Sequence, residues 1–291
     1  MEKYMYLIHG KIFKNSVFHI LMELLKETLR ILRSYGVKPS RRLSQNFVVD
    51  KHLLETIISY ASPSISDDVL DVGAGLGTLT ARLAEKAGKV IAVEIDKRLV
   101  KVLRDRFKHY GNVEVIHGDF LNLDVKASII VGNIPYHIST PILFKILNMR
   151  FKRAVLTLQK EVAERLIAKP GSKDYGRLTV STNIRANIEI IDTYPPESFY
   201  PPPEVFHSLV LLTPKDKIEV NLELLDNLLI KLFSQRNRIA KTVLRKTLIN
   251  DFGLDKGMES FKAIVESIPE NKRVYQLTID EIISICNRLK Q

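Results

Sequence analysis

Cysteine and long apolar runs are the features that this sequence most clearly lacks. Cys286 is the only cysteine, which excludes an intramolecular disulfide and a zinc cluster built from cysteines and is consistent with a reducing cytoplasm. No apolar run approaches the roughly 20 residues that span a bilayer. The nearest candidate, residues 17–25, is interrupted by His19 and Glu23, and we find no secretory signal. We therefore expect a cytoplasmic protein with no metal site and no membrane contact.

Acidic residues are too few to balance the basic ones. The chain has 44 lysines and arginines against 33 aspartates and glutamates, a net charge of +11 with a pI near 9.5. Such an excess indicates a polyanionic partner, because cations that neutralise phosphates release counterions and so favour binding. A solvated basic surface is the alternative. Apolar residues make up 45% of the chain, which is enough for a sizeable globular core.

Three segments are expected along the chain, without internal repeats or low-complexity tracts. Residues 1–37 form an N-terminal extension, in which an amphipathic helix is predicted over residues 17–34, ending near Gly36. Its apolar positions are Phe18, Leu21, Met22, Leu25, Leu29 and Leu32. We expect this helix to pack on the body of the protein; docking of a partner is the alternative. Residues 38–215 form the main domain, and residues 216–291 form a small all-helical C-terminal domain.

Short apolar runs alternate with helical patterns from Asp67 onward. Alternation of this kind indicates an α/β fold with a mostly parallel sheet covered by helices on both faces. The predicted strands are residues 69–72, 90–95, 113–116, 129–131, 155–158 and 205–212. The predicted helices are residues 78–87, 97–107, 141–147 and 161–168.

A glycine loop leaves the first predicted strand and opens a helix: Asp71-Val-Gly73-Ala-Gly75-Leu-Gly77. Glycines there allow a sharp turn and let a ligand approach main-chain N–H groups closely. Glu94 ends the next strand, where a carboxylate can accept hydrogen bonds from two ribose hydroxyls. Asp119 ends the third strand, where it can accept one from an adenine amino group. Either acid could instead cap the following helix, but their combination with the loop favours a nucleoside site.

The spacing of this loop distinguishes between two nucleoside cofactors. The dinucleotide fingerprint Gly-x-Gly-x-x-Gly places a pyrophosphate on a helix N-terminus. Here the third glycine, Gly77, falls one position early, and the helix starts with Thr78. A nucleoside without phosphates suits this loop better, which predicts S-adenosyl-L-methionine rather than NAD.

The tetrapeptide Asn133-Ile134-Pro135-Tyr136 follows the fourth predicted strand, at the sheet edge where such folds bind ligands. The exocyclic nitrogen of adenine is a poor nucleophile because its lone pair is delocalised into the ring. The side-chain oxygen of Asn133 and the carbonyl oxygen of Ile134 can accept its N–H bonds, which frees the lone pair for attack on a sulfonium methyl group. Pro135 stiffens the turn, and Tyr136 offers a stacking face worth about 1–3 kcal/mol. An ordinary turn is the alternative.

These motifs and several others together resemble one known family. The other segments are Gln45-Asn46-Phe47 and residues 159–162, 175–178, 199–205 and 234–238. From about residue 41 to residue 248 the chain closely resembles the dimethyladenosine transferases of small-subunit ribosomal RNA, which are Rossmann-like class I adenine-N6 methyltransferases. The resemblance implies methyl transfer to N6 of two adjacent adenosines near the 3′ end of that RNA, giving N6,N6-dimethyladenosines. It also implies that the enzyme works on a pre-ribosomal small subunit and takes part in its biogenesis, and we expect a monomer.

The resemblance implies a cofactor-binding role for eight residues, one of which, Asn133, also holds the target base. Gln45, Asn46 and Val48 close over the methionine end of the cofactor, with Gly73 and Gly75 beneath it, and Glu94 and Asp119 hold its ribose and its adenine. A cap at the start of a helix is the alternative for Gln45 and Asn46.

The resemblance also implies a site for the target base. Asn133, which also borders the cofactor, and Tyr136 hold the base, and Phe199 is the opposite face of a stacking clamp; core packing is the alternative for Phe199. Ser44 departs from the family, which more often has glycine there. Residues 1–37 exceed the family's core.

Six basic residues and no acidic one lie between Lys231 and Lys246. A helix over this segment places Arg238, Lys241 and Arg245 on one face. Solvated helix faces usually mix charges of both signs, so we interpret the segment as binding RNA phosphates through Arg236, Arg238, Lys241 and Arg245. A solvated face is the alternative.

Two other functions stay open from the sequence. A related adenine-N6 methyltransferase acting on large-subunit rRNA or on DNA needs the same tetrapeptide, because DNA enzymes also flip an adenine onto an aromatic ring. Residues 175–178 and 199–205 favour the small-subunit enzyme. The other is an assembly factor whose binding role outweighs its catalysis, although Asn133 and Tyr136 argue for activity.

Overall fold

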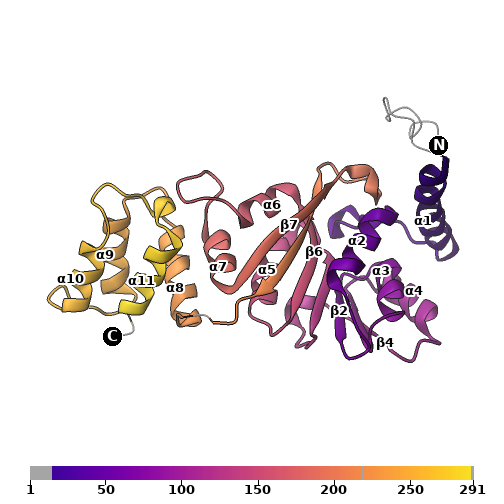
Figure 1. The fold of residues 1–291 in the computed structure, drawn as a ribbon, viewed down its shortest axis with the longest axis horizontal. Helices are drawn as coiled ribbons and strands as arrows, with labels where there is room; N and C mark the ends of the chain where they lie inside the picture. Colours follow the sequence, from indigo (N-terminus) through magenta and orange to yellow (C-terminus); the bar gives the residue numbers. More distant parts are fainter. Residues whose placement is uncertain (1–14, 218, 290–291) are drawn as a thin grey trace.

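A seven-stranded sheet forms the centre of the protein, as the computed structural model in Figure 1 shows. The structure describes residues 15–217 and 219–289, with side chains from residue 23 onward. The sheet has the strand order β4-β3-β2-β5-β6-β9-β7. Its strands are β2 (Asp68–Val72), β3 (Lys89–Glu94), β4 (Val113–His117), β5 (Ile129–Asn133), β6 (Arg153–Gln159), β7 (Ala186–Tyr194) and β9 (His207–Pro214). The first five strands in the sheet order are parallel, and β9 is antiparallel to both β6 and β7. The predicted mostly parallel α/β sheet is confirmed.

Successive residues of the central strands enter two separate hydrophobic cores. Val69 and Ile129 pack with helices α2 (Lys51–Ala61) and α3 (Thr78–Ala84) on one face. Leu70 and Ile130 pack with α5 (Ser139–Leu147) and α6 (Lys160–Leu166) on the other. Since both faces of the sheet are covered, its central strands are continuous apolar runs in the sequence.

Several elements were missed or displaced by the sequence prediction. Helix α2, helix α7 (Arg177–Arg185) and strand β7 were not predicted. The pairing of β7 with β9 is irregular between Ile190 and Asp192, and such an irregularity breaks the two-residue alternation that marks a strand. Helix α3 ends at residue 84 instead of 87, and β9 begins at residue 207 instead of 205.

The strand order determines where a ligand can bind. Strand β2 has β3 on one side and β5 on the other. The chain runs outward from β2 through β3 to β4 and then returns to the opposite side of β2 at β5. A reversal of this kind opens a crevice at the carboxyl ends of the strands. The glycine loop follows β2 and the Asn133-Ile-Pro-Tyr136 tetrapeptide follows β5, which pairs directly with β2. Two motifs far apart in the sequence therefore meet at one edge.

The chain after residue 221 is helical, as predicted, and lies at one end of the molecule in Figure 1. Its helices are α8 (Leu222–Phe233), α9 (Ala240–Asn250), α10 (Glu259–Glu266) and α11 (Ile279–Arg288). They share one hydrophobic cluster, which also takes in Tyr175, Val180 and Ile184. The Tyr175 hydroxyl donates to the Leu277 carbonyl over 2.8 Å. The helical unit is thus anchored on α7, and its division from the rest at residue 216 stays a prediction.

The prediction of one basic helix through residues 231–246 is wrong. Helix α8 ends at Phe233 and α9 begins at Ala240. The intervening residues are mostly polar, and Ile239 forms a bridge with Arg273. The chain must turn here because Leu232 of α8 and Val243 of α9 enter the same core. Arg238 therefore precedes α9 and does not share a helix face with residues 241 and 245.

Helix α1 (Asn15–Ser34) packs on the body of the protein, as expected. Ile31 and Leu32 share a cluster with Leu99 of helix α4 (Lys97–Phe107), and Glu27 forms a 2.8 Å ion pair with Arg106. Of the apolar positions predicted from residue 23 onward, only Leu32 is buried; Leu24, Thr28 and Ile31 complete the buried face instead. Phe18, Leu21 and Met22 lie outside the described side chains. Among the described helices, none has both the length and the apolar character that crossing a bilayer requires.

Candidate cofactor and target-base site

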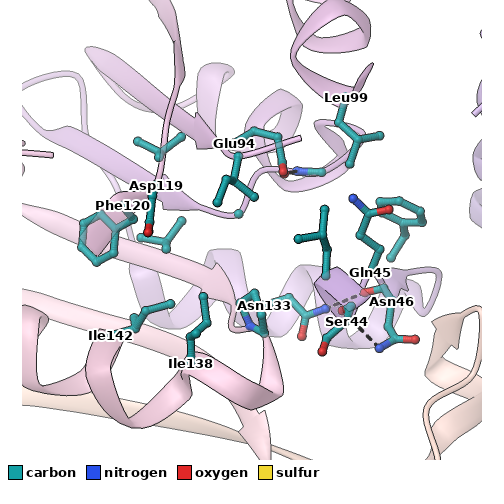
Figure 2. A pocket seen from close by; sticks show the side chains of 18 of the residues that line it. Ser44, Gln45, Asn46, Glu94, Leu99, Asp119, Phe120, Asn133, Ile138 and Ile142 are labelled. Carbon is teal, nitrogen blue, oxygen red and sulfur yellow. Dashed lines mark hydrogen bonds between the residues drawn. The ribbon is translucent and has the colours of Figure 1, made fainter. Parts of the chain in front are cut away.

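A pocket lies at the carboxyl ends of β2 to β5, as the strand order requires. Figure 2 shows Glu94 and Asp119 along one side of it, with Asn133, Ser44 and Asn46 opposite Glu94. Of the predicted cofactor residues, the pocket brings together Gln45, Asn46, Gly73, Gly75, Glu94, Asp119 and Asn133. Apolar lining that the sequence analysis did not single out comes from Leu43, Phe47, Val72, Val93, Ile95, Leu99, Phe120, Ile138 and Ile142.

The glycine loop takes backbone conformations that other residues rarely adopt. Gly73, Gly75 and Gly77 have φ angles of 73°, 60° and 81°. A Cβ on Gly75 would lie 3.1 Å from the Phe47 ring, so a side chain there would crowd the pocket. Gly77 is the N-cap of α3, and a Cβ there would lie 2.6 Å from the Phe107 ring. Gly73 and Gly75 thus line a space kept open for a ligand, whereas Gly77 allows close packing.

Glu94 is a buried carboxylate that also shapes the loop. Its side chain accepts hydrogen bonds from the backbone N–H groups of Gly75 and Asp96, both over 2.9 Å. Burial raises the pKa of Glu94, and these two bonds oppose that effect. A carboxylate offers about four acceptor positions, so two remain for hydroxyl groups of a ligand.

Asp119 both caps a turn and lines the pocket, so the two interpretations of this residue are compatible. Its side chain accepts from the Leu121 N–H over 2.9 Å at the start of the short helix Phe120–Asn122. Ile95 and Phe120 directly follow Glu94 and Asp119 in the sequence, and both line the pocket. Ile95 is 47% exposed. Each of these acids lies at the end of a strand and is followed by an apolar residue. This pattern could have been recognised in the sequence as a binding surface for a flat, apolar ring.

The segment before β1 (Phe47–Val48) forms one wall. Gln45 accepts from the Ser40 N–H over 2.7 Å and donates to Asp96 over 2.8 Å, which ties this wall to the start of α4. Asp50, and neither Gln45 nor Asn46, caps α2. Ser44 has a φ of 49°, a left-handed conformation that favours glycine. The family's preference for glycine at this position therefore has a backbone explanation.

Asn133 is oriented by a single hydrogen bond. Its Nδ2 donates to the Asn46 carbonyl over 2.6 Å, and because only the nitrogen of an amide can donate, the position of Oδ1 follows. Oδ1 is buried and has no hydrogen-bond partner. Most buried polar atoms are paired. Asn133, a residue of the pocket lining, therefore carries one buried, unsatisfied acceptor, on the side chain that the sequence predicts to accept from an adenine amino group.

Tyr136, three residues after Asn133, is not among the residues that line the pocket, and its hydroxyl is anchored to the pocket wall through Asn46. Asn46 Nδ2 lies 2.5 Å from the Tyr136 hydroxyl. Burial raises the pKa of Tyr136 well above its usual range, so the phenol is neutral at physiological pH. Pro135 lines the pocket, while the Ile134 side chain is 1% exposed and packs in the core.

Phe199 and Val48 lie away from the pocket. They pair with each other in the antiparallel sheet of β1 and β8 (Phe199–Tyr200), and neither is among the pocket residues. Phe199 is 2% exposed, and its ring lies 4.7 Å from that of His207, between the two centroids. Since Phe199 is buried and packs against His207, it offers no open face to a base in this arrangement, and the clamp stays a prediction.

The predicted RNA-binding residues fall into two groups. Arg236 donates to the carbonyls of Ser172, Lys173 and Tyr175, and Lys241 is 8% exposed and paired with Glu270 at 2.5 Å. Both side chains are thus engaged within the protein.

Arg238, in contrast, lines an exposed depression on the helical unit. Lys246 and Arg273 also line it, and none of its described lining residues is acidic. We call this the basic groove, defined by Arg238, Lys246 and Arg273. Arg245 is exposed, but it is not among the residues of the groove.

Comparisons with known proteins extend beyond the motifs. A model of the family "ribosomal RNA adenine dimethylase" matches residues 36–291. The chain is similar to the probable ribosomal RNA small subunit methyltransferase A of Pyrococcus abyssi, with 39% identity over 90% of this chain and 96% of that protein. The protein of the same name from Methanopyrus kandleri is 42% identical over 84% and 89% of the two chains.

Two solved structures share the fold. A dimethyladenosine transferase from Plasmodium falciparum matches with a TM-score of 0.75 and 29% identity, covering 84% of this chain and 97% of that one. The 23S rRNA methyltransferase ErmE matches with a TM-score of 0.64 and 25% identity, covering 84% and 100%. The Rossmann-like class I methyltransferase fold predicted from the sequence is thereby confirmed.

Proposed function

This chain belongs to the ribosomal RNA adenine dimethylase family and is an S-adenosylmethionine-dependent rRNA adenine dimethyltransferase; we propose that its targets are two adjacent adenosines near the 3′ end of small-subunit rRNA. Its product is then N6,N6-dimethyladenosine at both positions, made within a pre-ribosomal small subunit during biogenesis. The names of the two relatives at about 40% identity support the choice of the small subunit. A monomeric state and a cytoplasmic location stay predictions.

The buried, unpartnered Oδ1 of Asn133 is the observation that carries the catalytic part of this proposal, methyl transfer to an adenine amino group. An oxygen there accepts an N–H bond of the target amino group, as does the carbonyl oxygen of Ile134. Two acceptors on the same nitrogen draw its hydrogens out of the ring plane and localise the lone pair on nitrogen. Because Asn46 fixes the Asn133 amide, this acceptor is preorganised, and a preorganised dipole loses little energy to reorganisation during the reaction.

The residues of the pocket fit S-adenosyl-L-methionine, which supplies an electrophilic methyl group when it is bound. Glu94 has acceptor positions for two ribose hydroxyls, and Asp119 has one for an adenine amino group. Ile95 and Phe120 offer apolar surface for the adenine ring between these acids. Gly73 and Gly75 leave room at the turn beside Asn133. None of these residues presents a cation suited to a pyrophosphate, in agreement with the choice of this cofactor over NAD.

The same acceptors explain why transfer stops at two methyl groups. An adenine amino group that carries one methyl still has a hydrogen to donate to Asn133 or to the Ile134 carbonyl. A dimethylated nitrogen has none, so the site no longer holds it. No general base with a tuned pKa is required, because the nitrogen loses its proton after transfer, and the raised pKa of Tyr136 leaves that residue neutral as a stacking surface.

The basic groove is the proposed contact with the RNA backbone. None of the described residues that line the groove is acidic, and Arg273 there donates one hydrogen bond to the Asn237 carbonyl, whereas Lys241 is already paired with Glu270. We therefore assign phosphate binding to Arg238, Lys246 and Arg273, while direct contacts by Arg236, Lys241 and Arg245 remain unsupported proposals.

Mass spectrometry of rRNA provides the test. Partly assembled small subunits that lack the modification are incubated with the protein and labelled S-adenosylmethionine, with large subunits in parallel. Two dimethyladenosines on one small-subunit loop are expected. Tyr136→Ala should keep affinity for cofactor and RNA but lose most of the rate, while Tyr136→Phe, which keeps the stacking ring, should retain far more. Monomethyladenosine alone would contradict the stopping argument, and methylation of the large subunit would contradict the assigned target.

The large-subunit target is the second candidate, and the similarity to ErmE favours it. ErmE is named as a 23S rRNA methyltransferase, and its match covers a share of this chain, 84%, equal to that of the dimethyladenosine transferase. Its TM-score and identity are lower, however, and the relatives at about 40% identity carry small-subunit names. The large-subunit arm of the experiment decides between the two.

A further inference from the structure

The imidazole ring of His207 packs against Tyr136, the residue proposed to stack on the target base. His207 begins β9 and is fully buried. Its ring centroid lies 4.9 Å from that of Tyr136, with 39° between the planes, and 4.7 Å from that of Phe199, with 53° between the planes. These distances are within the range of interacting aromatic pairs. The three rings therefore form a continuous row from the core to the tetrapeptide.

The polar atoms of His207 take no part in an evident network. Neither Nδ1 nor Nε2 makes a hydrogen bond of ordinary geometry. Burial lowers the pKa of His207 to about 4, and an interaction of the ring with the backbone of Val205 opposes this effect only in part. The ring is thus neutral at physiological pH and unsuited to proton transfer. A buried polar group that lacks a good hydrogen bond lowers stability. The nitrogens of His207 therefore do not explain why a histidine occupies this position. Its flat aromatic surface is the property that its neighbours use.

The surroundings hold this ring rigidly. In β9, His207 lies opposite Gln159 of β6 and Tyr194 of β7, so its backbone is fixed on both sides by sheet pairing. Phe199 covers it from the core. Tyr136, in contrast, lies in a short helical turn after β5 and is anchored at its far end by the hydrogen bond to Asn46. The hydrogen bond to Asn46 and the ring contact with His207 therefore both bear on the ring plane of Tyr136.

We propose that His207 is a positioning residue that fixes the ring plane of Tyr136 for stacking of the target adenine, with Phe199 as its support. This inference rests on the proposed function, because it assumes that an adenine stacks on Tyr136. It differs from two other roles of the same side chain. As simple core filling, His207 would be replaceable by any side chain of similar volume. As an obstacle in the path of the base, its removal would accelerate the reaction.

Two substitutions at one position separate volume from aromaticity. His207→Leu keeps the approximate volume and removes the ring; His207→Phe keeps a ring and removes both nitrogens. Each eliminates the unpartnered polar atoms, so thermal unfolding should show folded proteins. His207→Met serves as a second volume-filling variant if H207L does not fold. Affinity for S-adenosylhomocysteine, measured by calorimetry, should be unchanged in all of them.

The readouts are the steady-state methylation of assembled subunits and the fluorescence of a hairpin RNA with 2-aminopurine at the target position. An aromatic pair contributes about 0.5–1.5 kcal/mol beyond its buried area, which corresponds to about two- to tenfold. We expect H207L to lower kcat/KM for RNA by that factor and to weaken the stacking-dependent quenching of 2-aminopurine, and H207F to restore both. Equal values for H207L and wild type would overturn the inference, as would faster methylation by H207L.

The wild-type control separates this inference from the proposed function. If wild-type protein produces no dimethyladenosine on the small subunit, the proposed function is wrong. If it does, and H207L matches it in rate and quenching, only the role of His207 is wrong.

Discussion

Replacement of Glu94 by alanine tests the proposed cofactor site most directly. The carboxylate is buried, and it accepts the backbone N–H groups of Gly75 and Asp96. Glu94→Ala therefore removes the proposed ribose contacts and also two hydrogen bonds that hold the glycine loop in place. The substitution should act on affinity and on stability separately, and each effect has its own magnitude.

The loss of affinity follows from the lost hydrogen bonds. Bonds to a charged group contribute about 1.5–3 kcal/mol net, so the dissociation constant should rise about 10- to 150-fold. The loss of stability is smaller. Two backbone N–H groups lose their acceptor, and each costs about 1–3 kcal/mol if no water replaces the carboxylate. Water can enter the pocket, however, and the substitution also removes the unfavourable burial of a carboxylate. We expect a net loss of about 1–2 kcal/mol with the fold intact.

The pH dependence of that loss has a definite sign. Burial raises the pKa of Glu94, so the folded protein holds this proton to a higher pH than the unfolded chain does. The contribution of Glu94 to folding is then largest at low pH and declines as pH rises through the raised pKa. The stability difference between wild type and Glu94→Ala should therefore shrink toward high pH.

Calorimetric titration with S-adenosylmethionine and urea denaturation at several pH values measure these effects. Glu85→Ala, at the exposed end of α3, is the matched control and should change neither. Glu94→Gln, which keeps one acceptor oxygen, should fall between wild type and alanine. Unchanged affinity in Glu94→Ala would remove Glu94 from the cofactor site and refute the reasoning.

Three further predictions concern the RNA contact, a buried acid and the wall of the pocket. Replacing all three cations of the basic groove by alanine should flatten the slope of log K for RNA against log salt by about two to three units, whereas the equally charged control K108A/K256A/K262A, at exposed positions outside the groove, should change it little; equal slopes in both would refute the groove. Burial raises the pKa of Asp71 to about 7, so stability should fall as pH rises from about 4 to about 7. Asp71→Asn keeps an acceptor for Thr80 and should flatten that fall in urea denaturation; an unchanged pH profile would show that Asp71 does not titrate there. Ser44→Gly should keep stability within about 1 kcal/mol, because relief of the left-handed φ offsets the greater freedom of the unfolded chain, whereas Ser44→Val should lose more than about 1 kcal/mol; equal melting temperatures of the two variants would contradict the backbone argument.

Local features of the sequence were sufficient for the nucleoside half of the site. The glycine loop, Glu94 and Asp119 each follow a buried apolar strand, and parallel strands bring their carboxyl ends to one edge whatever the details of packing. That rule brought Gly73, Gly75, both acids and, from the tetrapeptide, Asn133 and Pro135 to one pocket. It could not show that Glu94 also holds the loop through Gly75, because such a contact depends on the conformation of the loop.

Side-chain partners were the part that the sequence could not show. A count of cations does not distinguish Lys241 from Arg238. In the folded protein, Lys241 is paired with Glu270, whereas Arg238, in the turn between α8 and α9, lines the open basic groove. That turn forms because both helices must bury their apolar faces in one core, which is a property of the assembled unit. Helical spacing alone therefore predicted a face that does not exist.

The order of chain elements by itself thus determined the α/β sheet, its ligand-binding edge and the residue types found there, because strand pairing and the burial of apolar runs follow general rules. The tertiary structure alone decided the environment of each side chain. It left Oδ1 of Asn133 without a partner while Nδ2 is bound to Asn46, and it placed His207 between Tyr136 and Phe199. Both outcomes arise where segments distant in the sequence meet, and burial there sets which atoms can bind, which can ionise and which serve only as a surface.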